Sequence, residues 1–409
     1  MSVQPALGSR HLHVRRSSAG TATIAQLFVR WFNVLSLPAL LIAGWSYTNA
    51  LTAPGNLSVV ERSVEWLRGN HYGDTVSQVE AWYYAHHQPA EGGTLASMPI
   101  AVTDASVAAA KVAPGGTGLQ TGPARPTGST VDDHGITPFS ATPVPGEGVW
   151  QSLGDTTSAG TAMQAAYLRP DAIHGGVLSA VVRIDQSTMK FKLVPGADEP
   201  GNGPWGSRSQ LTTTDSAHLL AAFNSGFRIA DANGGFQLAE RTSGALRQGA
   251  ATIALAADGT LTLGNWGRDF SSADQPFAVR QNLDLIVDGG QLVDGLDSNK
   301  ANQWGKTVGN ALYVWRSGIG IDAQRRVLYA ASEGLSVKSL AALLQRAGAV
   351  RAMELDINHS WVSFNTFHHS SAGLIGAKLL KGMQKSPNRY LGPDARDYFA
   401  IEARASVAT

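Results

Sequence analysis

The sequence predicts an α+β domain with a mixed, hairpin-rich β-sheet core and few helices, preceded by an N-terminal transmembrane helix and a linker. Strand-like apolar runs recur from about residue 148 onward, and several join through Gly-containing turns. Within this domain the clearest helical pattern lies at 336–347. Many hairpins with few helices favour α+β over a doubly wound parallel sheet.

The composition supports a folded core and excludes several kinds of chemistry. Of the 409 residues, 43% are hydrophobic, which is enough to build a core. The chain has no cysteine, so a disulfide framework, a thiolate zinc site and a thiol nucleophile are excluded. The net charge is +1 and no basic stripe is present, so we do not expect nucleic-acid binding.

The N-terminus has the features of a membrane anchor. Residues 1–30 carry four arginines and no acid, and residues 31–60 contain no charge. The mostly apolar segment 31–50 is 20 residues long, and a helix of that length rises about 30 Å, enough to span a bilayer. The positive-inside rule then places the N-terminus in the cytoplasm and the main domain outside the cell membrane. A cleavable signal peptide is the alternative, and it would export the domain too.

Two segments separate the anchor from the main domain, which we expect at residues 148–405. Apolar stripes at helical spacing predict two short juxtamembrane helices within 56–88, broken at Gly69–Gly73. Residues 89–147 are rich in Pro, Gly, Ser and Thr, which predicts a flexible linker.

Local signals within the main domain predict two hairpins and a helix. Asp258-Gly259 lies between two apolar runs and predicts a type I′ turn, and Asp288-Gly289-Gly290 predicts another hairpin. Ser336 can cap a helix that ends before Gly348.

Three segments place polar side chains beside strand ends or glycines. Asn224 follows an apolar run, and Gly226 would let a ligand approach the backbone. Arg280 and Asn282 are two residues apart, so they share one face of a strand, and Arg316 follows a second, aromatic strand. Guanidinium groups suit phosphate or carboxylate ligands through paired donors. The alternatives are a polar turn at Asn224 and a salt bridge at the rim for Arg280.

The fourth segment, residues 351–364, places two carboxylates together. Glu354 and Asp356 would lie on one strand face with Cα atoms about 6.5–7 Å apart, beside Asn358 and His359. Such proximity would raise one pKa and keep the other low, which suits acid/base catalysis. No cofactor is required, although the two carboxylates could bind a divalent cation such as calcium. A loop cap and a salt bridge are the alternative roles.

Taken in order, the four segments resemble the phosphodiester glycosidase family over residues ~150–405. They read FNSGF (223–227), VRQNLDLIVDGG (279–290), WRSGIGID (315–322) and MELDINHSW (353–361). The family commonly continues Leu-Asp with Gly-Gly, whereas this chain has Ile357 and Asn358 there, which implies a bulkier site floor. The chain resembles a bacterial, membrane-anchored branch of the family.

The resemblance implies hydrolysis of a sugar-1-phosphodiester in a cell-envelope glycan, such as a sugar-phosphate or cell-wall glycan. Our hypothesis for this reaction gives the phosphate clamp to Arg280 and Arg316. Asp356 would act as base or nucleophile, Glu354 would tune its pKa or hold a cation, and His359 could serve as an alternative proton carrier.

The remaining candidates would bind substrate. Asn224 and Asn358 would orient sugar hydroxyls, and Gly226 and Asn282 would also contact the substrate.

Two other functions are compatible with the sequence. A non-catalytic, membrane-tethered module could bind anionic cell-wall glycans with the same arginines and would need no paired carboxylates. Another hydrolase, acting on peptidoglycan or ordinary glycosides, is the second alternative.

Overall fold

A computed structural model describes most of the chain and divides it into two units. The described residues are 38, 40–53, 57–101, 135–155, 163–201, 203, 205, 209–297, 303–305, 312–371 and 373–404. The first unit comprises Met1–Ala53 with Val59–Trp66, and the second comprises Pro54–Ser58 with Leu67–Thr409.

The described part of the first unit contains two helices, which aromatic and polar contacts hold together. Residues 40–52 are helical and are followed by α2 (Val59–Leu67). The rings of Tyr47 and Trp66 meet edge to face with centroids 5.1 Å apart, and the Trp66 indole N–H donates to Ser46 Oγ at 3.1 Å. Among the described residues, no helix is both long enough and apolar enough to cross a membrane. The predicted anchor, 31–50, lies partly outside these residues, because 31–37 and 39 are not described.

The second unit begins with a helical segment that is interrupted once. A π-helical stretch, η1 (Arg68–Tyr72), contains non-helical backbone at Asn70 and His71 and is followed by α3 (Gly73–His86). Part of the segment expected to be a flexible linker is bound to the domain: the Gly92 N–H donates to Ile173 O at 2.7 Å. Residues 102–134 of that segment lie outside the described residues.

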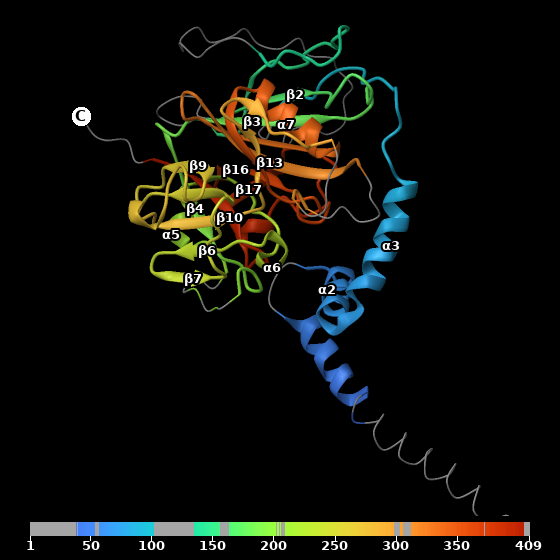
Figure 1. Ribbon diagram of the computed structural model, residues 1–409, viewed down its shortest axis with the longest axis vertical. Coiled ribbons are helices and arrows are strands. Elements are labelled where there is room, and N and C mark those ends of the chain that lie inside the picture. Colours follow the sequence, from blue (N-terminus) through green and yellow to red (C-terminus); the bar gives the residue numbers. More distant parts are fainter. Residues whose placement is uncertain are drawn as a thin grey trace, which may run out of the picture. The chain divides into compact units, whose positions relative to one another are not determined.

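The largest sheet has eight strands, and helix α7 (Val337–Arg346) packs on it (Figure 1). In spatial order its strands are β1 (Gln151–Ser152), β2 (Met163–Leu168), β3 (Ser179–Ile184), β14 (Val327–Leu335), β13 (Val314–Asp322), β15 (Ala349–Glu354), β11 (Leu285–Asp288) and β12 (Gln291–Leu292).

Two five-stranded sheets complete the domain. One has the order β7 (Arg241–Ser243), β6 (Phe236–Leu238), β10 (Ala278–Gln281), β8 (Ala251–Leu255) and β9 (Leu261–Asn265). The other has the order β17 (Gly373–Lys378), β16 (Phe364–Ser370), β5 (Leu219–Asn224), β18 (Tyr398–Ala403) and β4 (Met189–Val194). Short helical turns lie between strands, namely α5 (Thr213–Ser216), α6 (Ile229–Ala232), η2 (Ser272–Asp274) and η4 (Arg389–Leu391).

The predicted α+β class is confirmed, but the three sheets are antiparallel, not mixed. Every pairing between the named strands is antiparallel. Strands joined by tight turns must run antiparallel, because a parallel pair needs a long crossover. The hairpin signals in the sequence therefore already implied antiparallel pairing.

The two predicted hairpins form with different turns. Gly289 and Gly290 both have positive φ, 58° and 76°, as a type I′ turn requires. Between β8 and β9 only Gly259 has positive φ, at 81°, and Ala256 N–H donates to Thr260 O at 2.9 Å. The type I′ prediction is therefore wrong there, since a single left-handed glycine closes a longer loop. Helix α7 forms as predicted, with Ser336 Oγ accepting from the Ser339 N–H at 3.0 Å.

An aromatic cluster lies beneath the ends of several strands that carry polar motifs. The ring of Phe223 lies 5.8 Å from Phe364, 5.3 Å from Phe399 and 5.2 Å from Tyr329, and all four side chains are fully buried. Phe223 immediately precedes Asn224 and Phe364 follows Ser363, so this rigid packing fixes the backbone at one end of β5 and β16.

Candidate functional site

The structure brings the four polar segments together at the end of β15. The Asn282 side-chain amide donates to Glu354 O at 2.7 Å and to Leu355 O at 2.9 Å. The Ser317 N–H donates to Asp356 O at 2.9 Å, and Asn224 Nδ2 donates to Ser317 Oγ at 2.9 Å. Strand ends from two sheets and the loop after β10 therefore share one hydrogen-bond network.

Asp356 lies just beyond β15 and is 4% exposed. Its Oδ1 accepts from the Asn358 N–H at 2.9 Å, and its Oδ2 lies 3.5 Å from Arg396 Nη2. Burial raises the pKa of Asp356 to about 6, although Arg396 acts in the opposite direction. This carboxyl group can therefore change its protonation state near neutral pH.

Glu354 is the last residue of β15 and forms an ion pair with Arg316. Both side chains are fully buried, and Arg316 Nη1 donates to Glu354 Oε1 while Arg316 Nε donates to Leu335 O at 2.7 Å. Burial raises the pKa of Glu354 to about 6, more than Arg316 lowers it. Burial therefore raises the pKa of both Glu354 and Asp356. The prediction that one of these two pKa values would be high and the other low is wrong.

Arg280 is also buried in an ion pair. Its Nε donates to Asp397 Oδ2 at 2.8 Å, its Nη1 donates to Gln281 O at 2.7 Å, and its Nη2 donates to Phe227 O. Its exposed fraction is 1%, the same as that of Arg316. The structure therefore places neither of the two expected phosphate-clamp guanidinium groups where a ligand can reach it.

The amides at positions 224 and 282 hold the backbone of the site. Asn224 Oδ1 accepts from the Tyr329 hydroxyl and the Ser363 N–H, both at 3.0 Å. Asn282 Oδ1 accepts from the Phe227 N–H at 3.1 Å, and a Cβ on Gly226 would lie 2.7 Å from Asn282 Cγ. Both amides donate and accept within the protein, so these residues hold the turn at 225–227 in place.

Asn358 and His359 are half-buried and connect the site to the surface. Asn358 Oδ1 accepts from the Ser360 N–H at 2.9 Å, so the loop after Asp356 is held in a turn. Of the residues chosen from the sequence, these two lie where a ligand could approach Asp356.

A group of cationic side chains that the sequence did not indicate surrounds Trp361. Arg396, Arg389 and Lys385 lie over its ring at 5.0, 5.1 and 5.1 Å from the centroid. Arg389 is fixed to Asp394 by hydrogen bonds of 2.6 and 3.1 Å. The charge-rich stretch 393–397, in a chain with few charges, was the available signal, but nothing in its spacing connects it to Asp356.

The Arg396 guanidinium has a buried donor that makes no hydrogen bond among the described residues. Its Nη2 lies 3.3 Å from Gly226 O and 3.5 Å from Asp356 Oδ2, whereas its buried Nε has no partner among the described residues. Ser225 Oγ is likewise buried without a partner in the described part of the chain. A guanidinium with an unused donor beside a carboxyl group suits an anionic oxygen ligand.

The described residues offer no obvious metal site. They contain no group of three or more His, Asp or Glu side chains that could hold an ion. Glu354 and Asp356, considered above as calcium ligands, each face an arginine. The arginines therefore already compensate the negative charge that a cation would otherwise neutralise.

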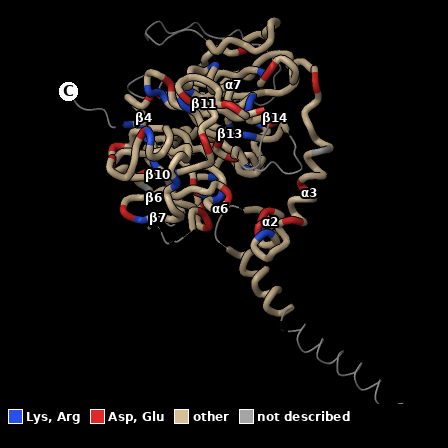
Figure 2. Tube along the Cα trace, in the orientation of Figure 1, with Lys and Arg blue, Asp and Glu red and all other residues tan. Residues whose placement is uncertain are grey.

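Figure 2 shows acidic and basic residues interspersed along the trace of the domain. In three of the described arginine–carboxylate pairs neither side chain is more than 1% exposed: Arg280–Asp397, Arg316–Glu354 and Arg389–Asp394. The carboxylate of each pair lies within two residues of Asp356 or Arg396 along the chain, so buried charge is concentrated around this site.

Comparisons with known proteins agree with the motifs. The phosphodiester glycosidase family model matches residues 218–356, which contain Asn224, Asn282 and Asp356. No curated protein matches the chain.

Two solved structures are similar at low identity. The catalytic domain of zebrafish N-acetylglucosamine-1-phosphodiester alpha-N-acetylglucosaminidase, auto-inhibited by its pro-peptide, is 14% identical with a TM-score of 0.38, over 68% of this chain and 100% of that one. A hypothetical protein from Synechocystis is 13% identical with a TM-score of 0.35, over 61% and 64%. Residues 218–356 thus match the phosphodiester glycosidase family, a family of hydrolases that cleave glycosidic bonds.

Proposed function

We propose that the domain hydrolyses a sugar-1-phosphodiester, with Asp356 at the anomeric carbon and Arg396 on the phosphate. The observation that carries this proposal is the pairing of a buried carboxyl group, whose pKa is raised to about 6, with a guanidinium that keeps one donor unused. Arg396 therefore takes the phosphate-binding role that the sequence suggested for Arg280 and Arg316, which are buried in ion pairs.

The reaction follows from the charges that these two groups supply. Water attacks the anomeric carbon, the bond from that carbon to the phosphate oxygen breaks, and the phosphate monoester leaves with the electron pair. In its ionised form Asp356 takes a proton from this water as a general base. If Asp356 is instead the nucleophile, its carboxylate attacks the carbon as the phosphate leaves, and water then cleaves the glycosyl ester in a second step. Arg396 stabilises the negative charge that develops on the leaving phosphate. Such a leaving group departs readily, so the site has little need of a strong general acid.

The other residues of the site have supporting roles in this proposal. Asn358 orients sugar hydroxyl groups, and His359 carries the proton to solvent, because both lie in the half-buried loop beside Asp356. Glu354 is paired with Arg316, and burial together with the negative charge of Asp356 raises its pKa. Asn224, Gly226 and Asn282 hold the turn on which the substrate rests.

We also propose that the substrate is a cell-envelope glycan and that residues 31–50 tether the enzyme to the membrane. This proposal rests on the uncharged segment and the four preceding arginines. The full chain should then remain with the membrane fraction after an alkaline wash, and a protease added outside intact cells should cut the main domain. Recovery of the full chain in the wash supernatant would contradict the tether.

Replacing Asp356 with Asn should reduce kcat/KM on a sugar-1-phosphodiester about 10²–10⁴-fold, because the amide cannot accept a proton. In the unchanged enzyme, kcat/KM should fall about tenfold per pH unit below pH ~6, where Asp356 becomes protonated. Steady-state kinetics between pH 4 and 8 measure both effects.

The matched control is Asp297→Asn, an exposed carboxylate that pairs with Lys338 at the surface. It should leave both the rate and the pH profile unchanged. Normal turnover by the Asp356→Asn enzyme would remove this residue from the mechanism.

Replacing Arg396 with Gln should lower kcat/KM about 10²–10³-fold on a phosphodiester, since it removes the charge that faces the leaving phosphate. On an uncharged aryl glycoside with the same sugar, the loss should be much smaller. Lys338→Gln, on the surface of α7, is the control for removal of a cation. Equal losses on the two substrates would show that Arg396 does not bind phosphate.

A further inference from the structure

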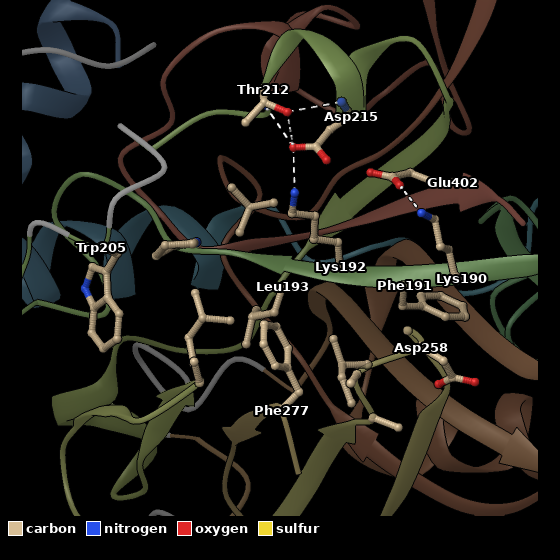
Figure 3. A pocket seen from close by; sticks show the side chains of 18 of the residues that line it. Lys190, Phe191, Lys192, Leu193, Trp205, Thr212, Asp215, Asp258, Phe277 and Glu402 are labelled. Carbon is tan, nitrogen blue, oxygen red and sulfur yellow. Dashed lines mark hydrogen bonds and ion pairs between the residues drawn. The ribbon is translucent and has the colours of Figure 1, made fainter.

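A groove lies between the edge strand β4 and the ends of β6 and β8 (Figure 3). Its volume is about 870 Å³, within the range of about 300–1,000 Å³ that is usual for pockets holding small organic ligands. Leu193, Leu238 and Phe277 supply an apolar lining, and Lys192 and Glu402 are among its polar residues. Neither Asp356 nor Arg396 lines the groove.

Strand β18 separates this groove from the candidate active site. Arg396 lies just before β18, and Glu402 lies near the other end of the strand. Six residues of extended chain span about 20 Å. Glu402 is therefore far from Arg396, whereas Val194, at the other end of the groove, lies opposite Tyr398 at the start of β18.

A buried carboxylate in the groove has one unsatisfied oxygen. Glu402 is 4% exposed, and its Oε2 pairs with Lys190 Nζ at 3.0 Å, while its Oε1 has no hydrogen-bond partner among the described residues. Leaving a buried acceptor without a donor is unfavourable, so a ligand hydroxyl that donates to this oxygen would be stabilised there. The Lys190 side chain is 41% exposed, so its ammonium can move aside and let a ligand donor reach the carboxylate.

The backbone at the groove also has open polar groups, but too few to bind a peptide strand. The Phe191 N–H points away from β18 and donates to Gly259 O at 2.8 Å. Leu193, two residues further, has the same orientation, so its N–H and C=O face the groove. Pro195 has no N–H and ends this edge. Strand addition needs a run of such groups, so single hydroxyl groups suit this edge better.

The remaining lining has apolar surface and balanced charge. Phe277 is 47% exposed, and the Trp205 ring is held between Arg241, 4.6 Å away, and Phe236, at 5.0 Å. Lys192 pairs with Asp215 at 2.5 Å, as Figure 3 shows, so the lysine charges are already compensated. An uncharged ligand with an apolar face and many hydroxyl groups matches this combination, and oligosaccharides have those properties.

We propose that the groove is a second glycan-binding site, which holds an uncharged stretch of oligosaccharide away from the bond that is cleaved. Phe277 packs against the apolar face of a sugar ring, and a sugar hydroxyl donates to Glu402. That this glycan is part of the substrate rests on the proposed function, whereas the binding itself does not.

The test measures binding separately from turnover, by calorimetry on the full-length Asp356→Asn protein. The probes are short soluble oligosaccharides of glucose, N-acetylglucosamine, mannose and galactose. At least one should bind, and adding Phe277→Ala or Glu402→Gln should weaken its binding about tenfold or more. The control is Ile173→Ala, which truncates an exposed apolar side chain outside the groove lining and should leave the affinity unchanged.

Undiminished affinity in both groove variants would overturn the proposal, and so would the absence of binding to every probe. If one groove variant shows no thermal unfolding transition, it is not folded, and the test then uses the other groove variant alone. If the wild-type chain cleaves no phosphodiester but the groove variants lose oligosaccharide binding, the proposed function fails while the second glycan site stands.

Discussion

The site depends on one constraint: the carboxyl group of Asp356 is held out of water where β15 ends. Backbone hydrogen bonds to Ser317 fix its position, and burial makes its ionised form costly. Arg396 offsets this cost only in part, because its guanidinium approaches to 3.5 Å and keeps Nε unused. A charge held in this way is better suited to reaction than to structural stabilisation.

Buried ion pairs around Asp356 keep the arrangement rigid. Arg280, Arg316 and Arg389 are each paired with a carboxylate that is almost fully buried. Removing one member of such a pair is strongly destabilising, since the partner is left buried and uncompensated. The Asp394 carboxylate also accepts from the Arg396 N–H at 3.0 Å, so one of these pairs places the guanidinium proposed to bind phosphate. Preorganised charge of this kind is the usual source of transition-state stabilisation.

The sequence predicted the class of fold and the segments that converge, but not the roles of the arginines. Alternating apolar runs, glycine turns and the Ser336 cap are local signals, and the corresponding elements form. Glu354 and Asp356 could be chosen because both lie in one short segment. Arg280 and Arg316 sit at strand positions whose side chains point inward, and their partners are far away in sequence at Asp397 and Glu354. Arg396 could not be found, because its contact with Asp356 joins segments 40 residues apart.

The most direct test compares the unfolding free energy of the wild-type protein and the Asp356→Asn variant from pH 4 to 8. The pKa of Asp356 rises from 3.8 to about 6 in the folded protein, so the folded state binds more protons in this window. Wild-type stability should therefore fall as pH rises through this range, and at pH 7 the Asn variant should be more stable by about 2–3 kcal/mol. A variant that is less stable than wild type at pH 7, or a difference that does not change with pH, would contradict a buried carboxylate with a raised pKa at this position.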